Sequence, residues 1–308
     1  AVDEVPAFYK QLFQMRNIKG FNIPDYINLF NNIKYHFINQ HPLGTFNNFP
    51  DIPKLVYIGG FLVEDKGILT EEKKEVKVNE KHNYLQLELH KTETRVSAFP
   101  SLGLSALPVL VSLGIGFSQN SRSRATLFSP PCVVFISFGT VNLTELFHIL
   151  KVSRAIEQMF ISFSLYQQCL FKLRIDENDL GYLPERRPPN VKILKRKVKQ
   201  QEILSKQNTK LFISHCGQNS LTEAMYAGVP LICIPFRGDQ FYNSSIVEQK
   251  HIGIYVYKDE MFGKHFNDAL NKILAKNQHQ LAANEMRNEI LNVKGIVAKN
   301  FLDKIAEV

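Results

Sequence analysis

From Cys132 onward, short apolar runs alternate with segments of helical spacing. The apolar runs are Val133–Ile136, Cys169–Leu173, Val191–Leu194, Lys210–Ile213, Leu231–Ile234 and Ile252–Val256. Helical spacing falls between most of them, as in Gln218–Tyr226 and Gln240–Lys250, and continues from Phe262 to Val308 with a break at Gly295. Strands that alternate with helices form β-α-β units with parallel strands. The sequence therefore predicts a doubly wound parallel α/β domain, Rossmann-like, over residues 132–308.

The beginning of the chain has a different pattern. Helical spacing is predicted for Val5–Asn17 and again for Pro24–Ile38, and Lys54–Ile58 is a short apolar run that reads as a strand ending at Gly59 and Gly60. Residues 1–60 are therefore expected to form one unit, separate from the α/β domain.

Residues 61–131 show no sustained periodicity, and we expect a poorly ordered linker or insertion there. Within this stretch, Val96–Ser121 carries no charged residue, which leaves a membrane span as one interpretation. Pro100, Pro108 and several glycines interrupt it, so an irregular insertion is the favoured interpretation.

Composition restricts the class of protein only loosely. The chain of 308 residues is 44% hydrophobic with a formal net charge of +8, which suits a folded protein and an anionic partner. Basic residues gather between Arg186 and Lys199, but no aromatic residues are interleaved with them. We interpret this run as a solvated loop and expect no nucleic-acid partner.

The cysteines show neither a C-x-x-C pair nor metal-ligand spacing, so neither a metal site nor a disulfide framework is predicted. Cys132 and Cys233 lie in apolar runs and are expected to pack as small hydrophobic side chains.

In a doubly wound sheet, ligands bind where strands end and helices begin. The first such turn is Ser137–Thr140, directly after a predicted strand. Gly139 permits a tight turn and a close approach to a ligand, and the Ser137 and Thr140 hydroxyls can donate to an anion. The same residue types are also favoured in an ordinary helix cap.

The second turn, Ser214–Ser220, carries more information. The strand before it ends at His215, Gly217 makes the turn, and a helix opens at Asn219 or Ser220 and is closed by Gly228. The free N–H groups of such a helix start favour a phosphate. A diphosphate there would favour the charged form of His215.

The next predicted strand ends before Asp239 and Gln240. A carboxylate beside an amide offers acceptors and donors to neighbouring hydroxyl groups, as in a sugar. An N-cap followed by an ordinary helix residue is the structural alternative.

These residues resemble the signature box of the family-1 UDP-glycosyltransferases, the group that includes the UDP-glucuronosyltransferases. The box opens with Trp, reads His-x-Gly-x-Asn-Ser-x-x-Glu in its middle and ends in Asp-Gln, and residues 197–240 have its length. Ser137–Gly139 is similar to the family's first phosphate turn, and 41–60 to the segment before the interdomain linker in nematode-like members. The resemblance covers about 1–60 and 132–308.

The resemblance implies that this chain is the C-terminal, donor-binding half of such an enzyme, and that residues 1–60 are a remnant of the N-terminal acceptor-side domain. The positions it assigns to the UDP-sugar are Ser137, Gly139, Thr140, Lys197, Val198, Gln200, His215, Gly217, Asn219, Ser220, Glu223, Asp239 and Gln240. Ser137, Thr140, His215, Gly217, Asn219 and Ser220 would cradle the diphosphate.

The remaining roles are implied in the same way. The Val198 backbone would bind uracil, Gln200 and Glu223 would reach the ribose, and Asp239 and Gln240 would hold the sugar hydroxyls. No cofactor or metal is expected, because the UDP-sugar is itself the donor substrate. The family's catalytic His base, supported by an Asp, lies in the N-terminal domain. No residue of this chain is assigned as the base, and its early histidines, among them His36 and His41, are interpreted as surface residues.

The chain departs from the box at two positions. Lys197 replaces the Trp that stacks on uracil, and Lys199 replaces the Pro that follows. A lost base–aromatic stack is worth roughly 1–3 kcal/mol, so uridine binding should be about 5- to 150-fold weaker.

By resemblance, then, we expect an enzyme that transfers a hexosyl or glucuronosyl group from a UDP-sugar to a small lipophilic acceptor. The full-length family member would be associated with the endoplasmic reticulum membrane on its lumenal face. This chain alone is expected to be inactive without the N-terminal domain. The alternative is a truncated or degenerate protein that binds a UDP-sugar without catalysis.

Overall fold

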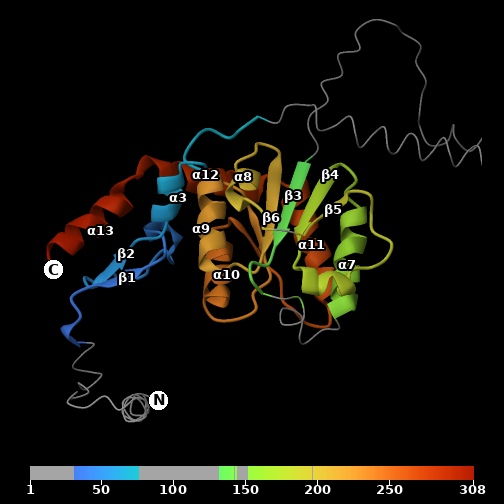
Figure 1. Cartoon of the computed structure of the whole chain (residues 1–308), viewed down its shortest axis with the longest axis horizontal. Coiled ribbons are helices and arrows are strands. Elements are labelled where there is room, and N and C mark those ends of the chain that lie inside the picture. Colours follow the sequence, from blue (N-terminus) through green and yellow to red (C-terminus); the bar gives the residue numbers. More distant parts are fainter. Residues whose placement is uncertain (1–30, 76–131, 142, 144–151, 196) are drawn as a thin grey trace, which may run out of the picture.

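The computed structural model describes residues 31–75 and 132–308, apart from 142, 144–151 and 196. Its centre is a parallel sheet of six strands in the order β5-β4-β3-β6-β7-β8. The strands are β3 (Cys132–Ser137), β4 (Cys169–Arg174), β5 (Val191–Leu194), β6 (Thr209–Ser214), β7 (Leu231–Cys233) and β8 (Gly253–Tyr255). The chain runs outward from β3 to β5 and then crosses back to β6, so the predicted doubly wound fold is confirmed (Figure 1).

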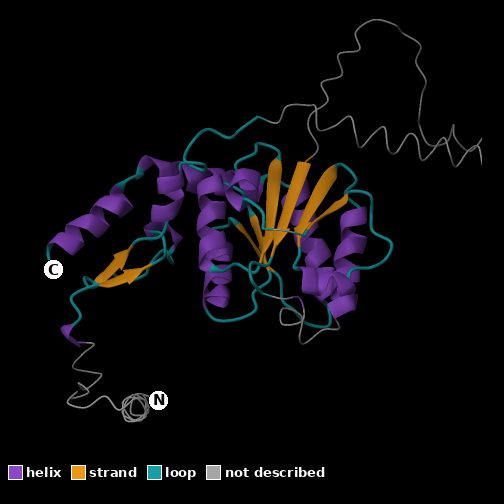
Figure 2. Ribbon diagram, viewed as in Figure 1, coloured by secondary structure: helices purple, strands orange, loops and turns teal. Residues whose placement is uncertain are grey.

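Helices cover both faces of this sheet (Figure 2). The helices are α7 (Val152–Ser164), α8 (Gln200–Leu204), α9 (Gln218–Ala227), α10 (Asp239–Gln249), α11 (Phe262–Ala275) and α12 (Gln278–Asn292). Helices α7 and α11 pack together on one face, and α9 packs with α8, α10 and α12 on the other. A 3-10 helix, η4 (Glu177–Tyr182), follows β4.

The alternation of side chains along the central strands explains why the sheet needs both helical layers. In β3, Val134 and Ile136 belong to the core cluster beneath α7 and α11, whereas Phe135 belongs to the cluster beneath α9 and α12. In β6, Ile213 and Phe212 divide between the two clusters in the same way. Strands that are apolar on both faces are buried only when helices cover both sides.

The N-terminal segment forms a small separate sheet. Strands β1 (His36–Ile38) and β2 (Leu55–Tyr57) pair in parallel, with the 3-10 helix η1 (Pro42–Gly44) between them. The C-terminal helix α13 (Ile296–Ala306) lies beside this sheet, where Phe301 contacts Phe37 with ring centroids 5.2 Å apart (Figure 1).

Two expectations about helices need correction. Helical spacing was expected as far as Ile38, but His36–Ile38 is a strand, because its pairing with β2 overrides the local pattern. The predicted helix over 5–17 lies outside the described residues.

The C-terminal region was expected to be helical from Phe262 to Val308 with one break at Gly295. That break is present, with a φ of 85° at Gly295, and a further break occurs at Lys276 and Asn277, between α11 and α12.

The expectation of a poorly ordered linker over 61–131 is wrong for its first part. Residues Phe61–Lys66 form helix α3, and Leu69, which is 1% exposed, joins the core cluster beneath α9 and α12. Residues 76–131, including the uncharged stretch, lie outside the described residues. None of the helices in the described part of the chain is long and apolar enough to cross a bilayer.

All four cysteines are paired, although their spacing predicted no disulfide framework, so Cys132 and Cys233 do not pack merely as small hydrophobic side chains. Cys132 is bonded to Cys169 and Cys216 to Cys233, with Cα atoms 4.4 Å and 5.4 Å apart. Cys132 and Cys169 face each other in the register of β3 and β4, which are adjacent only because the sheet brings them together. The spacing of the cysteines along the sequence does not predict that register.

Candidate functional site

The two predicted turns meet at the topological switch point of the sheet. Strands β3 and β6 are neighbours, and Ser137 at the end of β3 lies opposite Ser214 at the end of β6. The chain leaves β3 towards one side of the sheet and leaves β6 towards the other, and doubly wound folds bind their ligands at this switch point. The turns at Ser137 and His215 therefore lie at the same end of the sheet.

The imidazole of His215 lies between two glycines. A Cβ atom added at Gly139 would lie 2.7 Å from Cε1 of His215, and one added at Gly217 would lie 2.6 Å from its Nε2. Any side chain at either position would collide with the ring. Gly139 also has a φ of 64°, in the left-handed region that favours glycine. The absence of side chains at these two glycines therefore leaves the space that the His215 ring occupies at the switch point.

The backbone of the second turn is strained and held from several directions. Cys216 has a φ of 58°, which is uncommon for a residue with a side chain. Its N–H donates to Ser214 Oγ at 3.1 Å, and its carbonyl accepts from Asn243 Nδ2 at 3.0 Å. Its disulfide to Cys233 adds a covalent constraint. Such backbone conformations persist where the surroundings over-determine them, and they cluster at functional sites.

Helix α9 begins at this turn, so its amino end lies at the switch point. Gly217 is the N-cap residue and has no side chain to cap the first turn of the helix. The N–H of Gln218 donates to Asp239 Oδ2 at 3.2 Å, which already places one negative charge at the helix start. The helix dipole favours anions at this end. A phosphate there would share the helix start with the Asp239 carboxylate and would need the remaining N–H groups of the first turn as donors.

The environment of His215 sets its charge. Burial lowers its pKa from the ordinary value of 6.5, and the carboxylate of Asp239 partly opposes that effect by raising it. Ser214 Oγ lies 3.5 Å from Nδ1 of the ring. Near neutral pH the ring is therefore largely neutral without a ligand, and a nearby anion would favour protonation.

The residues assigned to the ribose also come together. Gln200, the first residue of α8, donates from Nε2 to Glu223 Oε2 at 2.6 Å and approaches Ser220 Oγ at 3.4 Å. Gln201 Nε2 donates to the other oxygen of Glu223 at 2.9 Å. Glu223 is thus held by two amides, one turn into α9. Both of its carboxylate oxygens therefore accept hydrogen bonds from amides in this structure.

Upstream of α8, the structure separates Val198 from Lys197. Val198 is half-buried and packs against the core cluster beneath α9 and α12, whereas the side chain of Lys197 is exposed. Lys199, also exposed, forms an ion pair with Glu202 at 2.8 Å. The position of the family's stacking aromatic is therefore occupied by a solvated cation.

Asp239 and Gln240 begin α10 and have different degrees of exposure. Gln240 is 6% exposed, and its Oε1 accepts from the N–H groups of Phe236 at 2.7 Å and Arg237 at 3.1 Å. Asp239 is exposed, and its Oδ2 accepts from Asn243 Nδ2 at 3.2 Å as well as from the start of α9. Asp239 therefore holds the start of α9, whereas Gln240 holds the loop that follows β7.

The structure adds residues that the sequence reasoning missed. Arg174, at the end of β4, donates to the carbonyl of Gly139 and pairs with Asp176 at 3.8 Å, so it supports the first turn. Asn39 donates to Asn219 Oδ1 at 3.0 Å and connects the N-terminal segment to α9. An arginine at a strand's carboxyl end was a usable signal for the first. Nothing local marks Asn39, because its partner is far along the chain.

His41 is buried, which corrects its interpretation as a surface residue. It is 1% exposed and packs edge-on against Tyr226 with ring centroids 5.6 Å apart. Its Nδ1 accepts from the N–H of Leu43 at 3.1 Å, so the ring caps η1. Burial lowers its pKa to about 4. His36 is half-buried, and His90 lies outside the described residues.

The fold is a doubly wound α/β domain with a helix start at its switch point, the arrangement that nucleotide-binding domains of this architecture use. The sequence model described as "UDP-glucoronosyl and UDP-glucosyl transferase" matches residues 132–291, just over half of the chain. The chain therefore belongs to this family of UDP-glycosyltransferases.

Curated relatives come from both plants and animals. UDP-glycosyltransferase 92A1 of Arabidopsis thaliana is 31% identical over 202 residues, which are 61% of this chain and 41% of that protein. The Caenorhabditis elegans protein ugt-46, whose name designates a UDP-glucuronosyltransferase, is 32% identical over 178 residues, which are 57% of this chain and 32% of that protein. The matched region thus spans less than half the length of these relatives.

Solved structures agree on the fold. A variant of Os79 from O. sativa, determined in complex with UDP, aligns with a TM-score of 0.52 at 19% identity. The alignment covers 82% of this chain and 50% of that one. At this identity the likeness supports the doubly wound architecture.

Proposed function

We propose that this chain supplies the donor site of a UDP-glycosyltransferase, and that it binds a UDP-sugar at the switch point between the β3 and β6 turns. One observation carries the proposal. Ser137 and Ser214 are paired at the ends of neighbouring strands, and the His215 ring lies against Gly139 and Gly217. Family membership supports the same ligand, and the relative Os79 has been solved with UDP.

In the proposed complex the diphosphate lies against the start of α9. The hydroxyls of Ser137 and Thr140 and the N–H groups after Gly217 donate to its oxygens, and His215 contributes a proton or a positive charge. Charge on the diphosphate grows as UDP leaves. Donors that are already in place stabilise that charge without reorganisation, which is how such a site lowers the barrier.

The nucleoside and the sugar would lie on opposite sides of the diphosphate. Glu223, steadied by Gln200, accepts from the ribose hydroxyls, and the Val198 backbone contacts uracil. On the sugar side, Gln240 has its amide oxygen engaged by backbone N–H groups, so its Nε2 is the atom that would donate to a hydroxyl. Asp239 would accept through Oδ1, because its Oδ2 holds α9 and Asn243.

Transfer requires a base that removes the proton of the acceptor hydroxyl. We propose that this base belongs to an N-terminal domain, as in the family, and that the acceptor is a small lipophilic molecule. His41 does not serve, because its ring is buried against Tyr226 and caps η1. The sugar is glucosyl or glucuronosyl, the alternatives that the family's description names.

We also propose a lumenal location at the endoplasmic reticulum membrane for the whole protein. The disulfides Cys132–Cys169 and Cys216–Cys233 support an oxidising compartment. Membrane association itself rests on the family resemblance.

The test is UDP release from UDP-glucose and from UDP-glucuronate with a panel of phenolic acceptors. The chain is assayed alone and then fused behind the N-terminal domain of a related enzyme. We expect turnover only in the fusion, abolished by His215→Ala and reduced by Gln240→Ala. Turnover by the unfused chain would show that it contains a base, and would refute the proposal that the base belongs to an N-terminal domain.

A second candidate function is a module that binds UDP-sugars without catalysis. The exposed Lys197 in place of a stacking aromatic favours it, because it predicts weak uridine binding. A fusion that binds UDP but transfers no sugar to any acceptor would select this alternative. A fusion that neither binds UDP nor turns over would reject the donor site itself.

A further inference from the structure

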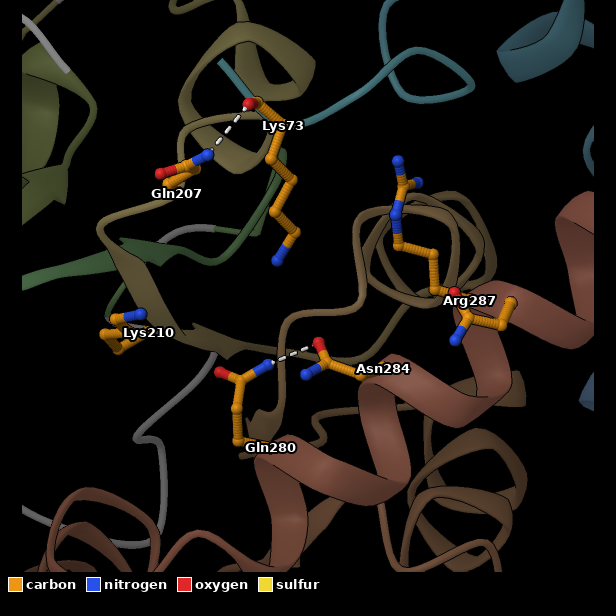
Figure 3. Close-up of a pocket in the computed structure, with 7 residues that line it drawn as sticks. Lys73, Gln207, Lys210, Gln280, Asn284 and Arg287 are labelled. Atoms are coloured by element: carbon orange, nitrogen blue, oxygen red, sulfur yellow. Dashed lines mark hydrogen bonds between the residues drawn. The ribbon is translucent and has the colours of Figure 1, made fainter. Parts of the chain in front are cut away.

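A pocket lies near the amino end of the central strand β6, and Figure 3 shows the residues that line it. It has a volume of about 490 Å³ and is lined by Lys73, Gln207, Lys210, Gln280, Asn284, Arg287 and Asn288. Lys210 is near the start of β6, whereas Ser214 and the His215 turn lie at its end. Because all strands of the sheet are parallel, the two sites lie at opposite ends of the same strands.

The chemistry of the lining is one-sided. Lysine and arginine contribute three positive charges, the remaining lining residues are amides, and none of the seven is acidic. The four residues from α12 recur at the spacing of one helix face, so that face presents Gln280, Asn284, Arg287 and Asn288 together. A pocket of this size lies within the range of small-molecule sites, roughly 300–1,000 Å³.

Backbone carbonyls hold the cations in place. The Arg287 guanidinium donates to the carbonyls of Leu69, Glu71 and Tyr226. Lys73 Nζ donates to the carbonyl of Gly228 at 3.2 Å, and Gln280 Nε2 donates to the same carbonyl at 2.9 Å. Carbonyl oxygens carry only partial negative charge, so these contacts orient the cations without neutralising them.

The cations also repel one another. Burial, followed by the charges of Arg287 and Lys210, lowers the pKa of Lys73 to about 8. In Figure 3 the Lys73 ammonium points into the space bounded by Lys210, Gln280 and Asn284. An anion in that space would offset the repulsion and accept hydrogen bonds from the ammonium and the amides.

We propose that this pocket is a second ligand site, distinct from the donor site, that binds a phosphate-bearing anion. Phosphate matches the lining because it accepts several hydrogen bonds and carries more than one negative charge, which suits clustered lysines and amides. The phosphate belongs either to a soluble small molecule or to the headgroup of an anionic lipid.

The proposal is tested with pyrophosphate as the soluble probe, measured by calorimetry on the full chain. The donor site is weakened by His215→Ala, so that the remaining heat reports the second pocket. Adding Lys73→Gln and Lys210→Gln removes two of the three positive charges and keeps polar groups in their place. We expect the second-site affinity for pyrophosphate to fall at least about tenfold, since hydrogen bonds to charged groups are lost.

Lys299→Gln is the matched control, because it removes one charge from an exposed side chain on α13, outside the pocket. It should leave pyrophosphate affinity unchanged. The single variant Lys210→Gln, at an exposed side chain, keeps the test valid if the combined variant does not fold. UDP binding in the His215-containing background should be the same with and without the pocket substitutions, which separates this test from that of the donor site.

A vesicle arm identifies the source of the phosphate. Flotation compares vesicles of phosphatidylcholine alone with vesicles that also contain phosphatidic acid. Binding to the acidic vesicles that is lost with Lys73→Gln and Lys210→Gln, but not with Lys299→Gln, assigns the pocket to a lipid headgroup. Pyrophosphate binding without such vesicle binding assigns it to a soluble ligand. If the pocket substitutions change neither pyrophosphate nor vesicle binding, the proposal is wrong.

Discussion

The ring of His215 lies directly against the backbone of Gly139, so that a Cβ atom at residue 139 would approach Cε1 to 2.7 Å and Nε2 to 3.0 Å. Gly139 belongs to the turn after β3 and His215 to the turn after β6. This contact therefore joins the two halves of the proposed diphosphate site across the switch point. It allows a substitution to test the site through its geometry.

Gly139→Ala should both destabilise the fold and weaken UDP binding. The added methyl group meets the His215 ring, at a cost of about 1–3 kcal/mol for overpacking, and the positive φ adds about 1–2 kcal/mol. Gly67→Ala is the matched control, since Gly67 has a φ of 70° but nothing lies within 4 Å of its added Cβ. Urea unfolding and UDP calorimetry compare the variants. If Gly139→Ala and Gly67→Ala lost the same stability and the same UDP affinity, the contact between Gly139 and His215 would be unimportant.

UDP affinity should rise as the pH falls from about 8 to about 6. Burial lowers the pKa of His215, so the free ring is mostly neutral at neutral pH, whereas the diphosphate favours the protonated ring. Binding therefore takes up a proton, and lower pH favours the complex. Calorimetry in buffers of different ionisation enthalpy measures this uptake directly. The His215→Gln variant should take up fewer protons when it binds UDP. Unchanged proton uptake would mean that the titrating group is another residue.

Lys197→Trp should strengthen UDP binding by roughly 1–3 kcal/mol, or about 5- to 150-fold, by restoring a stacking aromatic. Lys195→Trp introduces the same side chain two residues earlier, also at an exposed position, and should have little effect. Calorimetry with UDP is compared with calorimetry using pyrophosphate, which has no base to stack. A gain for both ligands, or for neither, would show that residue 197 does not face uracil.

Acid should destabilise the fold through His41. Its pKa is about 4 in the folded chain because of burial, below the ordinary 6.5 of an unfolded histidine. The unfolded state thus binds more protons between these values, so the stability present above pH 6.5 is lost as the pH falls towards 4. The difference of about 2.5 pH units corresponds to about 3 kcal/mol.

His41→Asn should remove this loss while retaining an acceptor for the Leu43 N–H. His251→Asn, at an exposed histidine with a φ of 55° that Asn tolerates, is the matched control for the substitution itself. Urea unfolding at several pH values gives the slopes. Parallel slopes for wild type and His41→Asn would contradict the assignment.

The unfolded chain should contain no reactive thiol until a reductant is added. Cys132 pairs with Cys169 and Cys216 with Cys233, so thiol titration in denaturant should detect thiols only after reduction. Each bond should contribute about 2–4 kcal/mol of stability. The paired substitution of Cys216 and Cys233 by Ser should also weaken UDP binding, because that bond constrains the site turn. Free thiols in the unreduced chain would argue against both pairs.

The strand–helix alternation after Cys132 was sufficient to predict the doubly wound domain and to place the Ser137 and His215 turns at strand ends. These features follow from periodicity within a few residues, since burial on two faces of a strand or one face of a helix leaves a local pattern. The signature offsets from His215 to Gln240 are likewise local, because one turn and one β-α unit contain them.

The contacts between segments distant in sequence were determined only by the tertiary structure. It made His36–Ile38 a strand through pairing with β2, buried His41 against Tyr226, and joined the cysteines in pairs. It also placed Lys73, Lys210 and Arg287 around one pocket. Such contacts depend on which strands become neighbours and in what register. The free energy that selects them comes from packing the whole sheet between its helices, so no local pattern of residues encodes it.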